Sequence, residues 1–252
     1  MDHKIRYAYF CRTGLVRKNN EDNFLVDLQN LDQVNDGMEG VRTGIMQTGA
    51  EAIPVAAVFD GMGGEAAGET AAFLASEQMK QFCRMNAGKA PSMQLHEELC
   101  GLMNLSVLGY AREHRIGIMG STVVYLIPGE DGIHCVNVGD SRIYRIFDDR
   151  IEQISTDHTL HGYFLRKSPL TQFIGLPDED LLLVPSVKVV PYEPGCRFLL
   201  CSDGVTDMLD DAEIQKTVAG YEDMEECLRV LAEKVYANGA RDNTTAVLCE
   251  VT

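Results

Sequence analysis

The stretch Val55-Ala-Ala-Val-Phe-Asp-Gly-Met-Gly-Gly64 joins an apolar run to an acidic, glycine-rich end. Its first five residues are typical of a buried β-strand, and an Asp-Gly pair after a strand is most often a turn. The same pattern recurs elsewhere. Apolar runs lead into Gly139-Asp-Ser-Arg142 and Ser202-Asp-Gly204, and Arg241-Asp-Asn243 comes just before another run. Several predicted strands therefore have an aspartate at one end.

Other apolar runs bounded by Gly, Pro and Asp predict further strands. These runs are Ile5–Cys11, Phe24–Leu28, Thr122–Ile127, Ile133–Val138, Ile143–Phe147, Leu181–Val190, Arg197–Cys201 and Thr245–Val251. Helices are predicted over Gly68–Met85, from an N-cap at Ser92 to about Arg115, from Asp210 or Asp211 through Val218, and over Glu222–Ala237. Because helices do not alternate one by one with strands, this order indicates an α+β fold, with antiparallel sheets and helices packed outside.

Two segments have no clear periodicity. Residues 30–54 are polar and glycine-rich, which predicts a long surface loop or an irregular hairpin. Residues 156–177 are also irregular, and long loops of this kind often carry function. We therefore expect the second segment to lie near a functional site.

Composition limits the possible functions. The chain has 252 residues, of which 45% are hydrophobic, enough for one large domain or two small ones. A formal net charge of −16 argues against partners with phosphate backbones and against anionic membranes. No run approaches the roughly 20 apolar residues of a membrane span, and the N-terminus lacks the apolar core of a signal peptide. We therefore expect a cytoplasmic monomer that binds neither nucleic acid nor membrane.

The eight cysteines could form four disulfides, but their surroundings favour another interpretation. Most lie in apolar runs or helical patterns, and no CxxC pair suggests zinc or a redox motif. We predict buried free thiols in a reducing compartment.

The acidic motifs predict a metal centre. A fifth motif, Arg17-Lys-Asn-Asn-Glu-Asp-Asn23, lies between the first two predicted strands. Packed sheets can bring such strand ends to one rim, where carboxylates would repel unless they share a cation. Ligands that are all oxygen favour Mg²⁺ or Mn²⁺. Two such ions ~4 Å apart would convert a shared water to hydroxide for in-line attack on phosphorus, and the planar fork of Arg17 suits phosphate oxygens.

Six motifs in order resemble the metal-dependent protein phosphatases of the 2C type, in their bacterial single-domain form. They are RKNNED (Arg17–Asp22), DGMGGEAAGE (Asp60–Glu69), GST (Gly120–Thr122), VGDSR (Val138–Arg142), SDGVTD (Ser202–Asp207) and RDNTT (Arg241–Thr245). The resemblance covers nearly the whole chain. It implies one catalytic domain over residues 1–252 with a four-layer α/β/β/α sandwich, two antiparallel sheets flanked by helix pairs, and metals in a cleft at one end.

The resemblance also implies roles for individual residues. Asp60 would bridge two Mn²⁺ or Mg²⁺ ions, and Arg17 would anchor the phosphate. The remaining ligands would be the Gly61 carbonyl with Glu21 and Asp22 on one ion, Asp203 and Asp242 on the other, and Asp140 with Asp203 and Asp207 on a third, weaker ion. Asn243 and Thr122 would have structural roles. The catalytic set is then Arg17, Asp60, Asp203 and Asp242.

Two features depart from the family pattern. Many eukaryotic members have a histidine after the Asp-Gly pair, where this chain has Met62. The segment of 156–177 that resembles the family's flap is shorter than in bacterial relatives. For His158 and His161, which lie in that segment, the simpler interpretation is a surface or capping role.

The leading hypothesis is hydrolysis of phosphoserine and phosphothreonine in proteins, with serine/threonine kinases and their targets as substrates. A phosphoprotein-binding pseudophosphatase is an alternative, but it predicts a lost ligand, whereas Asp60, Asp203 and Asp242 are all present. A different metal phosphohydrolase, such as a nuclease, is disfavoured by the acidic charge.

Overall fold

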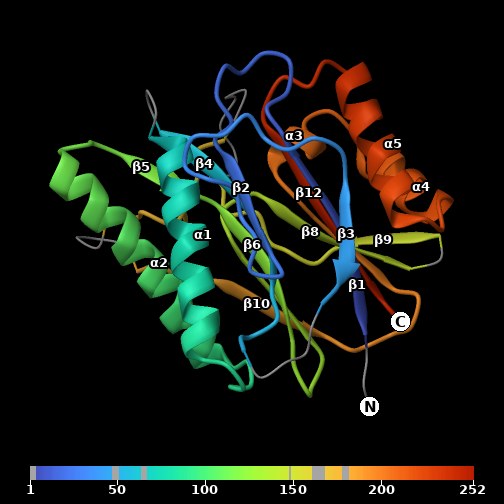
Figure 1. Cartoon of the computed structure of the whole chain (residues 1–252), viewed down its shortest axis with the longest axis horizontal. Coiled ribbons are helices and arrows are strands. Elements are labelled where there is room, and N and C mark those ends of the chain that lie inside the picture. Colours follow the sequence, from blue (N-terminus) through green and yellow to red (C-terminus); the bar gives the residue numbers. More distant parts are fainter. Residues whose placement is uncertain (1–3, 47–50, 64–66, 148, 161–167, 178–181) are drawn as a thin grey trace.

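The computed structural model describes residues 4–46, 51–63, 67–147, 149–160, 168–177 and 182–252. Over these ranges the strands form two antiparallel sheets (Figure 1). The first sheet has the order β3 (Arg42–Ile45), β1 (Ile5–Arg12), β12 (Thr244–Val251), β11 (Arg197–Cys201), β8 (Arg142–Phe147) and β9 (Arg150–Gln153). The second has the order β10 (Ser186–Val190), β7 (Ile133–Val138), β6 (Val123–Pro128), β4 (Ala56–Gly63) and β2 (Asp22–Val26), with β5 (Met119–Ser121) paired to β4.

Helices cover the outer face of each sheet. α1 (Gly68–Met85) and α2 (Met93–His114) pack against the sheet that contains β4 and β6. α4 (Asp211–Gly220) and α5 (Met224–Ala237) pack against the sheet that contains β1 and β12, and the short α3 (Asp203–Thr206) follows β11. The predicted four-layer α/β/β/α sandwich is confirmed (Figure 1).

Strand β6 shows why the central strands are continuously apolar. Val123, Tyr125 and Ile127 pack beneath α1 and α2, whereas Val124 and Leu126 pack between the two sheets. Successive side chains of a strand point to opposite faces, so a strand covered on both faces needs apolar residues at every position. The unbroken runs in the sequence are the signature of these two-sided strands.

The helix starts agree with the capping residues in the sequence. The Ser92 hydroxyl accepts a hydrogen bond from the Leu95 backbone N–H at 3.2 Å, as predicted for the start of α2. Asp210 caps α4 in a reciprocal capping box with Glu213. The Asp223 side chain caps α5 by accepting a hydrogen bond from the Glu226 backbone N–H. That helix therefore begins at Met224, two residues after the predicted start. Each such cap is worth about 1 kcal/mol.

Some boundaries differ from the sequence prediction. In the strand predicted over Leu181–Val190, the described residues form a strand only over Ser186–Val190, because Pro185 has no N–H to donate to a sheet ladder. The loop or irregular hairpin predicted over residues 30–54 contains β3, which pairs with the edge of β1. The short elements β5, β9 and α3 were not predicted, since three or four residues carry too little periodicity.

Two further expectations concern thiols and membranes. All eight cysteines lie in the described residues, and each one is buried and free of a disulfide, as predicted. Within the described ranges, the helices are too short or too polar to cross a bilayer.

A buried chain of polar groups connects α2 to the surface. The two ring nitrogens of His96 lie 3.1 Å from the Tyr125 hydroxyl and 3.0 Å from Nδ1 of His134. The other nitrogen of His134 lies 2.9 Å from the Asp131 carboxylate. His96 is fully buried, and its burial, followed by the neighbouring His134, lowers its pKa to about 4. His96 is therefore neutral in the folded protein at pH 7.

We predict that His96 makes the protein less stable as the pH falls. Below about pH 6.5 the unfolded chain takes up a proton at position 96 that the folded protein does not bind until about pH 4. One such proton costs up to about 1.4 kcal/mol of unfolding free energy per pH unit. Urea unfolding of the wild type and His96→Gln between pH 7 and 4.5 should show a shallower loss in the variant, because glutamine does not titrate.

The matched control is His114→Gln, at an exposed histidine near the end of the same helix. Its pH slope should follow that of the wild type. Equal slopes in His96→Gln and the wild type would contradict the assignment of the destabilising proton to His96.

Candidate metal centre

The antiparallel register brings the acidic motifs to one end of the sandwich. Asp22 begins β2 directly opposite Asp60 near the end of β4. In the other sheet, the end of β11 at Cys201 lies opposite Ala246 near the start of β12. The start of β2, the Asp60 part of β4, the end of β11 and the start of β12 therefore lie at the same end of the sandwich, near α3 in Figure 1.

The two Asp-Gly pairs are not turns, which corrects the simplest interpretation of the sequence. Asp60-Gly61 continues β4, and Asp203-Gly204 opens α3. A Cβ on Gly61 would lie 2.1 Å from the Gly68 carbonyl oxygen, and one on Gly204 would lie 1.9 Å from the Asn243 carbonyl oxygen. Glycine is needed at both positions because another backbone segment packs directly against it. This close packing holds the Asp60 backbone next to the start of α1 and the Asp203 backbone next to Asn243.

Asn243 ties three parts of the site together. Its Oδ1 accepts a hydrogen bond from the Glu21 backbone N–H at 2.9 Å. Its Nδ2 donates to the carbonyl oxygens of Thr13 and Asn19, both at 2.8 Å. The side chain thereby holds the loop between β1 and β2 against the start of β12.

Thr122 links Asp60 to the end of β7. The Thr122 backbone N–H donates to the Asp60 carbonyl oxygen at 2.9 Å, and its hydroxyl lies 3.3 Å from the Asp60 nitrogen. The same hydroxyl lies 2.6 Å from the Ser141 hydroxyl. Ser141 directly follows Asp140, so this hydrogen bond ties the Asp140 segment to Thr122.

Asp22 is a buried carboxyl in an acidic environment. Its side chain is 2% exposed, and Oδ2 accepts a hydrogen bond from the Ser202 hydroxyl at 2.7 Å. Burial raises the pKa of Asp22 to about 7; the Ser202 and Thr245 hydroxyls lower it, and the charges of Asp203 and Asp242 raise it. Near neutral pH this carboxyl exchanges a proton that a bound cation would displace. Ser202 was not singled out in the sequence, because a serine beside a strand end has no distinctive signal.

Arg17 joins the acidic cluster from the loop before β2. Its guanidinium lies 2.7 Å from the Asp242 carboxylate and 3.8 Å from that of Glu21. The hydrogen bond to Asp242 is the main cause that raises the pKa of Arg17, and the charges of Glu21 and Asp60 add to it. The side chain is 46% exposed, so it faces both the carboxylates and solvent.

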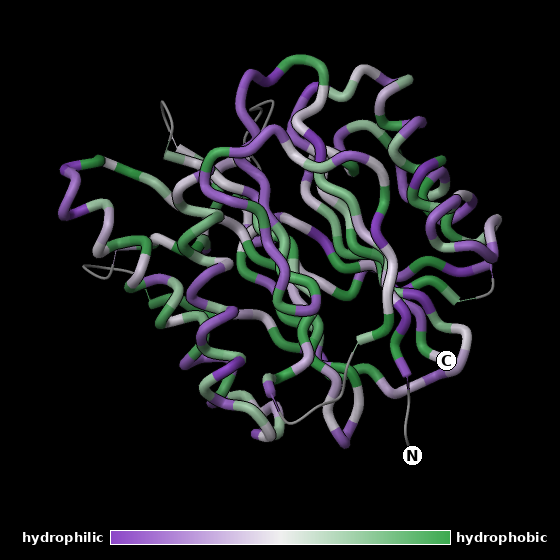
Figure 2. The backbone as a smooth tube through the Cα atoms, in the orientation of Figure 1, coloured by the Kyte–Doolittle hydropathy of each residue, from purple (hydrophilic) through white to green (hydrophobic). Residues whose placement is uncertain are grey.

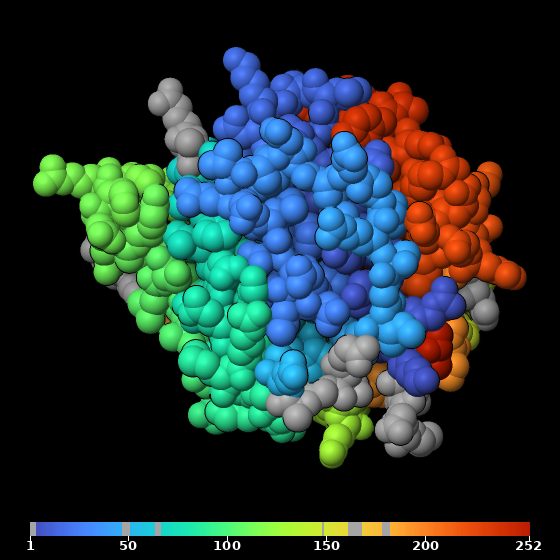
Figure 3. All heavy atoms as spheres, in the orientation of Figure 1, coloured from blue at the N-terminus to red at the C-terminus, as the bar shows by residue number. Residues whose placement is uncertain are grey.

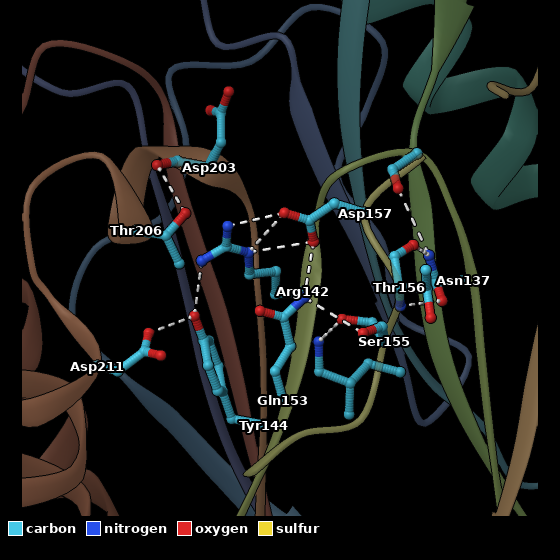
Figure 4. A network of polar contacts seen from close by, with 12 residues as sticks. Asn137, Arg142, Tyr144, Gln153, Ser155, Thr156, Asp157, Asp203, Thr206 and Asp211 are labelled. Atoms are coloured by element: carbon cyan, nitrogen blue, oxygen red, sulfur yellow. Dashed lines mark hydrogen bonds and ion pairs between the residues drawn. The ribbon is translucent and has the colours of Figure 1, made fainter. Parts of the chain in front are cut away.

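Asp203 begins the short helix α3, and Asp207 follows its last residue as the C-cap. The Asp207 backbone N–H donates to the Asp203 carbonyl oxygen at 2.7 Å, which places Asp207 one turn after Asp203. In Figure 4 the Asp203 carboxylate points away from the network around Arg142. The charge of Asp203 is one of the causes that raise the pKa of Asp22.

Arg142 fixes the start of the flap-like segment 156–177. Its guanidinium contacts both Asp157 carboxylate oxygens, the closest at 2.7 Å, and donates to the Tyr144 hydroxyl at 3.0 Å (Figure 4). The Tyr144 hydroxyl donates in turn to Asp211 of α4 at 2.8 Å. His158 accepts a hydrogen bond from the Gly139 backbone N–H at 3.2 Å, and its other ring nitrogen lies 2.9 Å from the Ser186 hydroxyl, so it links the flap-like segment to the end of β7 and to β10. The flap residues 161–167, His161 among them, lie outside the described residues.

Glu69 is a candidate residue that the sequence interpretation did not single out. It lies in the first turn of α1 and is nine-tenths buried. Its Oε2 has no hydrogen-bond partner among the described residues. Burial is the main cause that raises the pKa of Glu21. The charge of Arg17 lowers this pKa, and the charge of Glu69 raises it. The available signal was a lone carboxylate on the buried face of an alanine-rich helix.

The donor set fits hard divalent cations. As the side chains lie, no three His, Cys, Asp or Glu groups of the described residues are close enough to hold one ion together. Nevertheless, the cluster offers only oxygen donors, contains the unsatisfied Glu69 oxygen, and raises the pKa values of Asp22 and Glu21. A cation would relieve each of these costs with a small movement of side chains.

Comparison with known proteins identifies the family. The family model "Protein phosphatase 2C" matches residues 43–245, so the chain belongs to the protein phosphatase 2C family. The serine/threonine phosphatase stp of Listeria innocua is 29% identical over 212 residues, which is 78% of this chain and 84% of that protein. The chain is therefore a metal-dependent phosphatase of serine and threonine residues in proteins.

Solved structures share the fold. PppA, described as a key regulatory component of T6SS in Pseudomonas aeruginosa, superposes with a TM-score of 0.79 at 28% identity, covering 98% of both chains. The catalytic domain of PstP in complex with two manganese ions superposes with a TM-score of 0.77, covering 99% of both chains. At 24% identity, that second likeness concerns the fold alone.

We predict that Mn²⁺ binding releases a proton from Asp22. With a pKa of about 7, this carboxyl should lose about half a proton at pH 7 when a divalent cation binds beside it. Binding should therefore tighten between pH 6 and 8. Calorimetric titration in two buffers of different ionisation enthalpy counts the protons released per ion.

Asp22→Asn should release fewer protons than the wild type, and Asp32→Asn, at an exposed carboxylate in a surface loop, serves as the control. The same proton count in the wild type and Asp22→Asn would show that the released proton comes from another group.

Proposed function

We propose that residues 1–252 act as a single catalytic domain that hydrolyses phosphoserine and phosphothreonine in proteins, using Arg17, Asp60, Asp203 and Asp242. The observation that carries this proposal is the meeting of Arg17 with the carboxylates of Asp242 and Glu21 at one end of the sandwich. A phosphate needs an arginine fork, and its hydrolysis needs cations that carboxylates can hold. Both kinds of group lie within a few ångströms of one another here.

Two ions, Mn²⁺ or Mg²⁺, would be held by oxygen donors of the cluster, and a third would bind nearby. The proposed ligands are Asp60 for both ions, Glu21, Asp22 and the Gly61 carbonyl for one, Asp203 and Asp242 for the other, and Asp140, Asp203 and Asp207 for the third. When bound, such ions supply a nucleophilic water at neutral pH and offset the charge of the phosphate oxygens.

The other residues of the chain prepare this site. Arg17 presents a planar fork to phosphate, which carries more charge than the single carboxylate of Asp242 that it contacts at 2.7 Å. Asn243 holds the Arg17 loop through the Thr13 and Asn19 carbonyls. Met62 is half-buried opposite Gly120 and has no titratable proton, so it does not act as a general acid.

The substrates are proposed to be phosphorylated proteins, in particular serine/threonine kinases and their targets. The relatives named serine/threonine phosphatase support phosphoprotein substrates. A net charge of −16 disfavours nucleic acid and anionic membranes as partners. We also propose that the enzyme acts as a monomer in the cytoplasm.

We predict that Asp60→Asn and Asp242→Asn each lower kcat by about 100-fold or more, because each removes a charge that holds a cation at the reaction centre. Release of phosphate from p-nitrophenyl phosphate and from a phosphothreonine peptide, with and without Mn²⁺, measures the effect. Circular dichroism and thermal unfolding should show that both variants stay folded.

The control for both variants is Asp149→Asn, which removes an exposed carboxylate at the β8–β9 turn. It should keep wild-type kcat. Full activity in Asp60→Asn or Asp242→Asn would remove that residue from the metal centre. Folded wild-type protein that releases no phosphate at any metal concentration would favour a phosphoprotein-binding role.

We predict that Arg17→Ala raises KM about tenfold or more with a smaller change in kcat. Arg17 binds phosphate in the ground state and the transition state alike, and a charge-assisted hydrogen bond is worth about 1.5–3 kcal/mol. Steady-state kinetics with p-nitrophenyl phosphate measures both constants. Lys18→Ala, at the neighbouring exposed cation, should leave this small substrate's KM at its wild-type value, and an unchanged KM in Arg17→Ala would exclude the anchoring role.

A further inference from the structure

The loop before β2 exposes two aliphatic side chains beside the proposed phosphate anchor. Leu15 is 63% exposed and Val16 is 66% exposed, and they directly precede Arg17. Figure 2 shows a short apolar stretch in the loop at the top of the view, between β1 and β2. Single exposed aliphatic residues need no explanation, but two in sequence next to a binding arginine suggest a contact surface.

This loop is held in place by polar contacts on both sides. The Leu15 backbone N–H donates to the Ala240 carbonyl oxygen at 2.8 Å. The Thr13 hydroxyl donates to the Asp36 carbonyl oxygen at 2.9 Å, and Asn243 holds the carbonyls of Thr13 and Asn19. The apolar pair is therefore fixed relative to Arg17, so that a partner would lose little by ordering it.

Arg17 is paired with the Asp242 and Glu21 carboxylates, whereas the exposed cations Lys18 and Arg241 have no ion pair among the described residues. Arg17 and Lys18 follow it in sequence, and Arg241 is exposed next to Ala240, which accepts the Leu15 hydrogen bond. In Figure 3 the N-terminal loop, in blue, lies against the C-terminal segment, in red, at the edge of the molecule. A basic flanking sequence would be repelled here, and an acidic one attracted.

We propose that Leu15 and Val16 bind an apolar side chain close to the phosphorylated serine or threonine of a protein substrate, with Lys18 and Arg241 favouring acidic over basic flanking residues. The proposal rests on the proposed function, because it places the phosphate on Arg17. Val16 adjoins Arg17, and an extended peptide advances about 3.4 Å per residue, so the apolar residue lies within about three positions of the phosphoresidue.

A cycle of substitutions on both partners tests this surface. The peptides are acidic phosphothreonine peptides with leucine placed at each of three positions on either side, each matched to a peptide with serine there. The proteins are the wild type and the double variant Leu15→Ser with Val16→Ser. At one peptide position, the wild type should prefer leucine about tenfold in kcat/KM, and the double variant should lose most of that preference.

Two controls separate contact from general damage. Leu105→Ser removes an exposed leucine on α2 and should keep the wild-type preference. Val16→Thr keeps the side-chain shape and adds a hydroxyl, so it replaces the double variant if that protein does not fold. A leucine preference that is absent from the wild type, or that is the same in wild type and variant at all six positions, would overturn the proposal.

Binding of the same peptides to Asp60→Asn, followed by fluorescence anisotropy, separates this proposal from the proposed function. A leucine preference in binding that depends on Leu15 and Val16, without turnover by the wild type, would support the surface and reject the catalytic assignment. Turnover of every peptide with no coupling between the leucine and the two residues would reject the surface and keep the catalytic assignment.

Discussion

The mutual repulsion of carboxylates at one end of the sandwich is the constraint on which the rest of the site depends. Asp22 is almost completely buried there, and Asp203 and Asp242 are close enough to raise its pKa. Glu69 and Glu21 add a second such pair. Acidic groups gathered in this way cost stability unless a cation offsets them, so the fold holds in place a site whose natural complement is a divalent metal.

Backbone packing supplies the rigidity that opposes this repulsion. Gly61 and Gly204 allow neighbouring segments to approach closer than a side chain would permit. Asn243 then fastens the loop that carries Arg17 and Glu21 to the start of β12. These contacts are made by the backbone and by a neutral side chain, so they hold the segments that carry the charged residues without relying on charge.

The same rigidity extends outward from the acidic cluster. The loop that carries Arg17 also presents Leu15 and Val16 to solvent, and its backbone is held by Ala240. Arg142 and Asp157 fasten the first residues of the flap-like segment to β8. Both the loop before β2 and the start of the flap-like segment are thus held by polar contacts.

The sequence alone determined the layers of this protein and the candidates for its chemistry. Apolar runs such as Thr122–Ile127 predicted the strands, and caps such as Ser92 marked helix starts. Aspartates at the ends of several predicted strands indicated a metal centre, because the sequence shows directly where each apolar run ends. Tertiary structure decided which of these groups meet. Glu69 became relevant only when α1 placed it beside Glu21, and Ser202 only when β11 placed it against Asp22, across 180 positions of chain. Periodicity and capping are local properties that a sequence displays directly, whereas contacts between distant segments depend on register and packing, which no single stretch of sequence contains.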